Sequence, residues 1–213
     1  MWQKNACWAM IARGKTDLIH RPAAYIGQSK GSQMAKKISH GALVISVAFM
    51  AGVASAGSGA PDFTFQSIDG GSYNTADWRG KPILVVNTAS QCGYTPQYAA
   101  LQALSDQYAG RAIVLTVPSD DFNQELASNA EVKEFCELNY ALTLPMTTIE
   151  HVASGDVHPL FGWLRDAHSV VPDWNFTKVL LGKDGQFIAS WGSGTVPTSA
   201  KITNAIDQAL LGG

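Results

Sequence analysis

The chain has few cysteines and none of the common nucleotide-binding motifs. Its 213 residues include three cysteines, too few for the disulfide framework of a small secreted miniprotein. The residue three positions after Cys92 is Thr95, so the Cys-x-x-Cys pair of a dithiol exchanger is missing. The sequence also lacks Gly-x-Gly-x-x-Gly and a Gly-rich loop that ends in Lys-Ser or Lys-Thr, which are the usual signals of dinucleotide and phosphate binding.

Basic residues are scarce after residue 56. The whole chain carries 15 Lys+Arg and 17 Asp+Glu, a net charge of −2, but seven of the basic residues and one acid lie in residues 1–56. Residues 57–213 therefore hold eight basic and sixteen acidic residues, a net charge of −8. Such an asymmetry separates a tail or targeting segment from a domain. An acidic domain also lacks the clustered Lys and Arg of a nucleic-acid surface, so no nucleic-acid partner is expected.

The basic N-terminal part contains a pattern typical of a secretory signal. Residues 41–53 form an uncharged, mostly apolar run that follows Lys36 and Lys37 and precedes Ala54-Ser55-Ala56. A basic region, an apolar region and an Ala-x-Ala site are the three parts of a signal peptide. The run is short for a membrane span, which needs about 20 apolar residues. We therefore expect a signal peptide over residues 34–56, cleavage after Ala56 and a periplasmic or secreted protein, with an uncleaved anchor or a buried helix as alternatives.

Residues 1–33 fit no signal and show no sustained periodicity. Met34 begins a signal of ordinary length, so we interpret Met34 as the real start and residues 1–33 as a doubtful extension. Cys7 lies in this extension and receives no role. Residues 57–213 are long enough for one domain with a sizeable core.

The domain shows alternating strand and helix signals. Strands are expected at residues 63–65, 83–88, 112–117 and 142–149 and in a hairpin over 176–192 that turns at Asp184-Gly185. Helices are expected from Thr95 to about Gly110 and over residues 128–140, 158–167 and 198–211. Thr95 is the expected N-cap of the first helix, with Pro96 at its first position. This order predicts an α/β fold with helices on both faces of a sheet.

Cys92 follows a buried strand and precedes a helix. Ligand sites in α/β folds lie beyond the carboxyl ends of strands, and the free N–H groups of a helix N-terminus stabilise a thiolate. These features favour a reactive thiol over the alternative of a buried, inert cysteine. No Cys or His lies near Cys92 in the sequence, and His151 and His158 are seven residues apart. We therefore expect no metal and no cofactor, and we expect the histidines at the surface.

Residues 87–98 (NTASQCGYTPQY) resemble the active-site segment of the glutathione peroxidase family. Residues 122–125 (FNQE) resemble the Gln-Glu block of that family, and residues 174–178 (WNFTK) resemble its Trp-Asn-Phe-Thr-Lys block. The blocks occur in the family's order, and the resemblance runs from about Pro61 to the C-terminus. It implies a thioredoxin-like fold with a central mixed sheet.

The resemblance also implies four catalytic residues: Cys92 as the peroxidatic thiol, surrounded by Gln124, Trp174 and Asn175. Carboxamide and indole N–H groups can stabilise a thiolate and hold a peroxide oxygen without adding a titrating group. By spacing alone, Trp174 could instead be a core residue and the two amides could be loop or cap residues. The chain departs from the family at Asp120-Asp121, where many members carry Asn-Gln. We expect these two acids to face solvent.

Cys136 lies in a block similar to the one that holds a resolving cysteine in relatives that use thioredoxin. The resemblance therefore implies that Cys92 becomes a sulfenic acid, that Cys136 condenses with it, and that a dithiol partner reduces the disulfide. Because Cys136 is predicted in mid-helix, this step needs local unwinding. The alternative is that Cys136 is a core residue and that glutathione resolves Cys92 directly.

The sequence as a whole therefore predicts a thiol peroxidase that reduces hydrogen peroxide and organic or lipid hydroperoxides, with an antioxidant role. A thioredoxin-like reductant is favoured over glutathione because the basic residues of the domain are scattered. A peroxide sensor that oxidises a client protein and a non-catalytic binding module are the alternatives. The tetrameric members of the family carry extra loop sequence that is missing between Leu142 and His158, so we expect a monomer. Because the apolar run of residues 41–53 is short, we expect no stable membrane span.

Overall fold

The computed structural model describes residues 60–212, and all statements about structure concern this part of the chain. The predicted extension and signal peptide, including Cys7 and Met34, lie outside the described residues. Within residues 60–212, no helix combines the length and the apolar character that crossing a bilayer requires.

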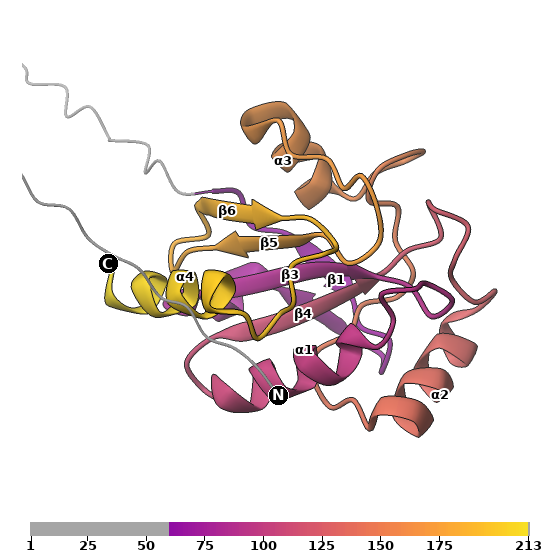
Figure 1. Cartoon of the computed structure of the whole chain (residues 1–213). Coiled ribbons are helices and arrows are strands. Elements are labelled where there is room, and N and C mark those ends of the chain that lie inside the picture. Colours follow the sequence, from indigo (N-terminus) through magenta and orange to yellow (C-terminus); the bar gives the residue numbers. More distant parts are fainter. Residues whose placement is uncertain (1–59, 213) are drawn as a thin grey trace, which may run out of the picture. The chain divides into compact units, whose positions relative to one another are not determined.

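A four-stranded mixed sheet with the order β4-β3-β5-β6 forms the centre of the fold (Figure 1). The strands are β3 (Ile83–Thr88), β4 (Ile113–Pro118), β5 (Lys178–Leu181) and β6 (Phe187–Trp191). β3 pairs with β4 in parallel and with β5 antiparallel, and β5 pairs antiparallel with β6. All six residues of β3 are buried, as expected for a strand covered on both faces.

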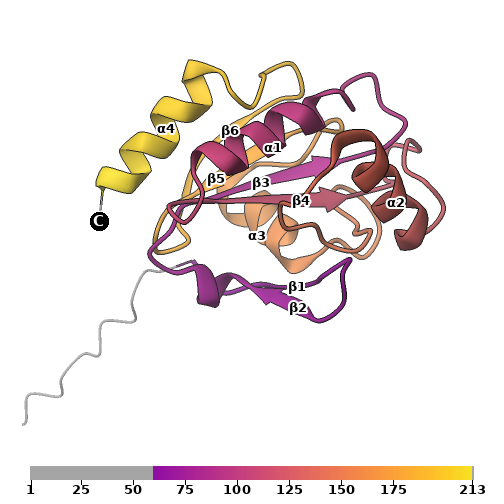
Figure 2. The ribbon, with the colours of Figure 1, turned by 90° about the horizontal axis from the view of Figure 1, so that it is seen from below.

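Helices cover both faces of this sheet, as predicted. The helices are α1 (Gln97–Gln107), α2 (Asn129–Tyr140), α3 (Pro159–His168) and α4 (Ala200–Leu211). A separate hairpin of β1 (Thr64–Gln66) and β2 (Ser72–Asn74) is followed by the 3-10 helix η1 (Thr75–Trp78). Figure 2 shows α1 and α4 on one side of the sheet and α3 and the hairpin on the other.

The alternation of side chains along the strands produces two hydrophobic cores. Leu84, Val86 and Leu180 face a cluster that takes residues from α1, α2 and α4 and also contains Cys92 and Cys136. The intervening strand residues face a second cluster, built with α3 and β1. Both cysteines of the domain therefore belong to the same core.

The prediction of a strand at residues 142–149 is wrong. This segment forms two isolated bridges, a parallel one from Met146 to Thr116 of β4 and an antiparallel one from Thr147 to Ser67 beside β1. Pro145 has no N–H to donate, and its carbonyl accepts from the Thr116 N–H at 3.0 Å. Because neighbouring residues of the segment bond to two different sheets, neither ladder extends.

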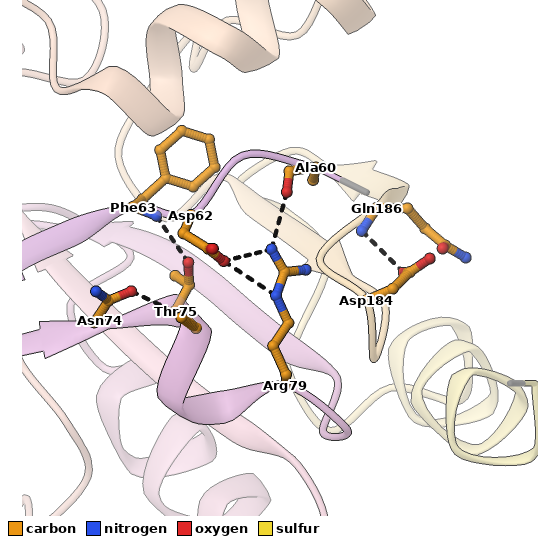
Figure 3. A network of polar contacts seen from close by, with 9 residues as sticks. Ala60, Asp62, Phe63, Asn74, Thr75, Arg79, Asp184 and Gln186 are labelled. Atoms are coloured by element: carbon orange, nitrogen blue, oxygen red, sulfur yellow. Dashed lines mark hydrogen bonds and ion pairs between the residues drawn. The ribbon is translucent and has the colours of Figure 1, made fainter. Parts of the chain in front are cut away.

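Arg79, which follows η1, holds the start of the described chain. Its guanidinium group donates to the Ala60 carbonyl at 2.9 Å and forms an ion pair with Asp62, while the Phe63 N–H donates to Thr75 Oγ1 at 2.9 Å (Figure 3). The β5–β6 turn packs against the same guanidinium group. Gly185 in that turn has φ +80°, and a Cβ at this position would collide with the Arg79 side chain.

We predict that Gly185→Ala lowers the free energy of unfolding by about 1 kcal/mol or more, because alanine is strained at positive φ. For a domain of this size, such a loss lowers Tm by roughly 2–4 °C per kcal/mol. The matched control is Gly162→Ala in α3, where a Cβ would meet no atom within 4 Å. This second change should stabilise the helix by about 0.5–1 kcal/mol. Thermal unfolding that ranks the variants in the opposite order would contradict this interpretation.

Candidate active site

Cys92 lies in the loop between β3 and α1, with 7% of its surface exposed. Among hydrogen bonds formed by residues 60–212, one reaches its sulfur: the Tyr94 N–H donates to Cys92 Sγ at 3.4 Å. This main-chain N–H is a hydrogen-bond donor that points at the sulfur from the next turn of the loop. No atom lies within 4 Å of the position of a Cβ on Gly93, so the chain beside Cys92 borders open space.

The Thr95 side chain closes this loop and does not cap the helix, contrary to the sequence prediction. Its hydroxyl accepts from the Cys92 N–H at 3.0 Å and donates to the Ala89 carbonyl at 2.8 Å. The N-cap position of α1 belongs to Pro96, which offers no side-chain hydrogen bond. The Thr95 hydroxyl thus holds the tight turn around Cys92, and α1 begins at Gln97, two residues after Thr95.

The segment between β4 and α2 holds the Cys92 loop from one side. The Gln124 carbonyl accepts from the Gln91 N–H at 2.9 Å, and Glu125 Oε1 accepts from the Ser90 N–H at 3.0 Å. The same Oε1 atom also accepts from the Leu126 N–H at 2.8 Å. Two adjacent residues therefore bind the two residues that precede Cys92, which explains how Gln124 comes to the site.

Asn175 lies against Gln124. Its Nδ2 group donates to Gln124 Oε1 at 3.1 Å, and within residues 60–212 the Gln124 amide N–H groups have no acceptor. Asn175 is fully buried, and its Oδ1 atom has no hydrogen-bond partner among the described residues. The structure thus brings together Gln124 and Asn175, the two amide residues that the sequence predicted for the site. Trp174 precedes them with 41% of its surface exposed, and its ring packs on Phe122 at 5.3 Å between centroids.

Sequence reasoning assigned no role to Asn87, although this residue positions the 174–177 turn. Asn87 is buried in β3, and its Nδ2 group donates to the Trp174 carbonyl at 3.2 Å. Asn87 Oδ1 accepts from the Thr177 N–H at 2.9 Å, and its carbonyl accepts from the Phe176 N–H. A polar residue in an otherwise apolar central strand is the signal that could have indicated this role.

Lys178 is a second residue whose role was missed. It is fully buried, and its Nζ group donates to Gln97 Oε1 at 2.6 Å and to the Ser193 carbonyl at 3.1 Å. Burial lowers the pKa of Lys178 to about 8. The Ser193 hydroxyl in turn donates to the Asn175 carbonyl at 2.6 Å. Lys178 therefore connects the first residue of α1 to the segment that fixes Asn175.

Two residues beside the site amides have left-handed backbone conformations. Asn123, which precedes Gln124, has φ 56°, and Phe176, which follows Asn175, has φ 64°. A bulky residue at positive φ is rare and costs free energy. At Phe176 the conformation is held by the bond to Asn87 and by burial of the ring against Tyr98, at 5.4 Å between centroids. Asparagine tolerates this conformation, so the strain lies at Phe176, next to Asn175, and such strain is typical of a functional site.

The expectation that Asp120 and Asp121 both face solvent is wrong for Asp121. Its side chain is 2% exposed, and it accepts from the N–H groups of residues 152–154 and pairs with His151 at 2.6 Å. Burial opposes ionisation, but the bonds from His151 and these N–H groups lower the pKa of Asp121 below its usual value. Asp121 thus organises the neighbouring loop.

The histidines are also less uniform than expected. His151 is at the surface, but His158 is buried with 8% exposure. His158 stacks on Phe65 at 3.9 Å, accepts from the Leu160 N–H and bonds to the Thr64 carbonyl. Its ring therefore caps α3 and fastens that helix to β1, a structural task that spacing in the sequence does not show.

Cys136 lies in the middle of α2, with 2% of its surface exposed. Burial raises the pKa of its thiol to about 11. Cys92 and Cys136 are both free thiols. Val132 and Cys136 are the two fully buried residues of α2, and a small cavity of about 30 Å³ lies between Cys136, Lys133 and Ile68. Cys136 thus lies in the same core cluster as Cys92, and its thiol is covered by other residues.

Several known proteins are similar to this chain in sequence. The family model described as glutathione peroxidase matches residues 61–165. A glutathione peroxidase of Lactococcus lactis is 38% identical over 64% of this chain and 90% of its own. A hydroperoxy fatty acid reductase of Synechocystis is 38% identical over 62% of this chain and 85% of its own. A glutathione peroxidase-like peroxiredoxin of Schizosaccharomyces pombe is 38% identical over 67% of this chain and 92% of its own.

The fold agrees as well. A thioredoxin family protein from Chlorobium tepidum, a thiol:disulfide interchange protein, superposes with a TM-score of 0.55, covering 71% of this chain and 95% of its own at 15% identity. This likeness confirms the predicted thioredoxin-like fold. The identities to the three relatives and their coverage show that this chain belongs to the glutathione peroxidase family.

Proposed function

We propose that this chain is a thiol peroxidase that reduces hydrogen peroxide and organic hydroperoxides, including those of lipids, with Cys92 as the attacking thiol. The observation that carries this proposal is the buried Cys92 sulfur, which accepts the Tyr94 N–H in a loop whose main chain bonds to Gln124. The Gln124 side chain in turn pairs with Asn175. Membership of the family makes the protein an oxidoreductase of the peroxidase class. A relative named for fatty acid hydroperoxides supports the inclusion of lipid substrates.

The residues of the site fit the first step of peroxide reduction. The Cys92 thiolate attacks one peroxide oxygen, the O–O bond breaks, and Cys92 becomes a sulfenic acid while water or an alcohol leaves. The free N–H groups of Gln124 and the indole N–H of Trp174 supply hydrogen bonds to the peroxide oxygens. Asn175 fixes the orientation of the Gln124 amide through its 3.1 Å bond. In this proposal the partly exposed Trp174 and Tyr94 rings form the rim that an apolar hydroperoxide contacts.

We predict that Cys92→Ser lowers the consumption of hydrogen peroxide and of a fatty acid hydroperoxide by more than about a hundredfold, because serine is not ionised near neutral pH. The rate is measured by peroxide disappearance with excess dithiol. Cys7→Ser, made in the full chain of 213 residues before any cleavage, is the matched control and should keep the original rate. Substantial turnover by the Cys92 variant would contradict the assignment of the attacking thiol.

We propose that Cys136 resolves the sulfenic acid and that a thioredoxin-like dithiol reduces the resulting Cys92–Cys136 disulfide. Only 2% of the Cys136 surface is exposed, so a protein reductant cannot make direct contact with this thiol while α2 is intact. Local unwinding of α2 would bring the two sulfurs together, and Val132 and Cys136 are the two fully buried residues that it would expose. The alternative is reduction of Cys92 by glutathione, without Cys136.

We predict that Cys136→Ser lowers thioredoxin-dependent turnover by about tenfold or more, since no disulfide can form for the dithiol to reduce. Oxidation of Cys92 by peroxide should continue, and a sulfenic-acid trap measures it. Turnover with glutathione and with thioredoxin is compared on the same enzyme. Full thioredoxin-dependent turnover of the variant would refute the resolving role. A stable mixed disulfide with one client protein and poor turnover would favour a peroxide sensor.

We also propose that the protein is exported as a monomer after cleavage of residues 34–56. The support is the basic, apolar and Ala-x-Ala order of that segment in the sequence. The acidic charge of residues 57–213, −8, would then be the charge of the working enzyme. The reductant would have to be an exported dithiol protein or a relay across the membrane.

We predict that the protein expressed in a bacterium with two membranes is found in the periplasm with residue 57 at its N-terminus. Mass spectrometry of the purified protein gives this terminus. Replacement of Ala54 and Ala56 by arginine should block cleavage, because signal peptidase needs small residues at these positions. A precursor that begins upstream of Met34 would contradict the proposed start, and an unprocessed protein in the membrane fraction would favour an anchor.

A further inference from the structure

Lys178 is a buried cation that the proposed reaction does not yet use. It is the first residue of β5, and none of its surface is exposed. Among the ion pairs formed within residues 60–212, none includes Lys178. Burial of a charge without a counter-ion costs free energy, and an apolar side chain of similar volume is often tolerated at such a position. The packing of the core alone therefore gives little reason for a lysine here.

The two acceptors of Lys178 belong to a closed ring of hydrogen bonds. The Lys178 Nζ group donates to Gln97 Oε1 of α1 at 2.6 Å and to the Ser193 carbonyl, just beyond β6, at 3.1 Å. Gln97 Nε2 donates to the same carbonyl at 2.7 Å. Each of the three residues thus contacts the other two. Because an ammonium group can only donate, Lys178 also fixes which end of the Gln97 amide faces it.

This ring is connected through Ser193 to the amide that is proposed to bind the peroxide. The Ser193 hydroxyl donates to the Asn175 carbonyl at 2.6 Å, and both residues are buried. Asn175 Nδ2 in turn donates to Gln124 Oε1 at 3.1 Å. A series of contacts therefore leads from Lys178 through Ser193 and Asn175 to the Gln124 amide.

The charge of Lys178 strengthens the first contact of this series. Burial lowers the pKa of Lys178 to about 8, so about nine molecules in ten still carry the charge at pH 7. A hydrogen bond from an ionised donor is roughly twice as strong as one between neutral groups. The Ser193 carbonyl is therefore held by a strong donor near neutral pH.

We propose that Lys178 is a positioning residue of the peroxide reaction, an inference that rests on the proposed function of Cys92. Lys178 holds Ser193, Ser193 holds the main chain at Asn175, and the Asn175 side chain sets the direction of the Gln124 amide. A peroxide needs hydrogen-bond donors at fixed places while its O–O bond breaks and the leaving oxygen gains negative charge. A small displacement of Gln124 therefore slows this step without changing the thiol itself.

Lys178→Met separates positioning from two other roles. Methionine is unbranched and apolar, so the change removes the charge and both hydrogen bonds while an extended side chain still fills the site. If the charge acts through space on the Cys92 thiolate, the variant needs a higher pH to ionise Cys92. If Lys178 only supports the fold, all reactions of Cys92 change together. Positioning predicts instead that the reaction with peroxide slows and that other reactions of the thiolate do not.

The experiment compares two reactions of Cys92 in the full chain, with Cys7 replaced by serine in every variant. Oxidation by hydrogen peroxide is followed with a sulfenic-acid trap. Alkylation by iodoacetamide, from about pH 5 to pH 9, is followed by mass spectrometry of the peptide that contains Cys92. Alkylation needs the thiolate but no hydrogen bond to a peroxide oxygen. For Lys178→Met we expect oxidation slower by about tenfold or more, alkylation at high pH within about twofold of the parent, and the same pH midpoint of alkylation.

Two further variants test the series of contacts, and a third is the control. Ser193→Ala deletes the hydroxyl that reaches Asn175 but keeps the carbonyl that Lys178 binds, and it should also slow oxidation. The double variant Lys178→Met/Ser193→Ala should be no slower than the slower single variant, because both changes break the same series. The control is Lys201→Met, since Lys201 is exposed on α4. It should react as the parent does.

Oxidation of Lys178→Met at the parental rate overturns the inference. Equal slowing of oxidation and alkylation assigns Lys178 to the support of the fold, and a higher pH midpoint of alkylation assigns it to the charge of the thiolate; both results overturn positioning. Effects that multiply in the double variant show that Lys178 does not act through Ser193 and overturn it as well. A parent that forms no sulfenic acid at Cys92 refutes the proposed function instead.

Thermal unfolding shows whether Lys178→Met is folded. If it is not, Gln97→Met and Ser193→Ala carry the same test from the two ends of the ring. Gln97→Met removes one acceptor of Lys178 and one donor to the Ser193 carbonyl. Each variant should slow oxidation of Cys92 by hydrogen peroxide and leave its alkylation within about twofold of the parent. Parental oxidation in either of them overturns the inference.

Discussion

The arrangement of the site depends on the hydrogen bonds of one amide, Asn87, near the end of the central strand β3. The strand continues directly into the Cys92 loop, and its Asn87 side chain and main chain bind the 174–177 turn. Two segments that are about 80 residues apart in the sequence are thereby attached to one rigid strand. A buried amide without partners would cost about 1–3 kcal/mol. Moving the 174–177 turn away from Asn87 would therefore lower the stability of the fold. Trp174 and Asn175 keep their places for this reason.

Much of this fold follows from local patterns in the sequence. The apolar runs of β3 and β4, the face of α1 and the Asp184-Gly185 turn are strong signals, because burial and positive φ limit which residues fit there. The segment at residues 142–149 was misjudged because its apolar character reflects contacts to two different sheets. Pro145 was the warning, since a proline interrupts a ladder. Such long-range bridging has no signature within a short window.

The reactive residue of the site could be predicted from the sequence, but most of the residues that hold it in place could not. Cys92 could be assigned from its place between a strand and a helix, and the blocks that hold Gln124, Trp174 and Asn175 from their resemblance. Thr95, Asp121 and Lys178 were misjudged or missed because a side chain has several possible partners. Which partner it takes depends on segments far away in the sequence, such as residues 152–154 for Asp121.

The hydrogen bond from Tyr94 to sulfur has a consequence for how such a site changes over evolutionary time. The donor is a main-chain N–H, which every amino acid except proline carries. The residue at position 94 can therefore vary in size, charge and polarity while the bond to Cys92 persists. The side chain at position 94 can thus change with the molecules that approach the sulfur, whereas the hydrogen bond to the sulfur is inherited with the course of the backbone.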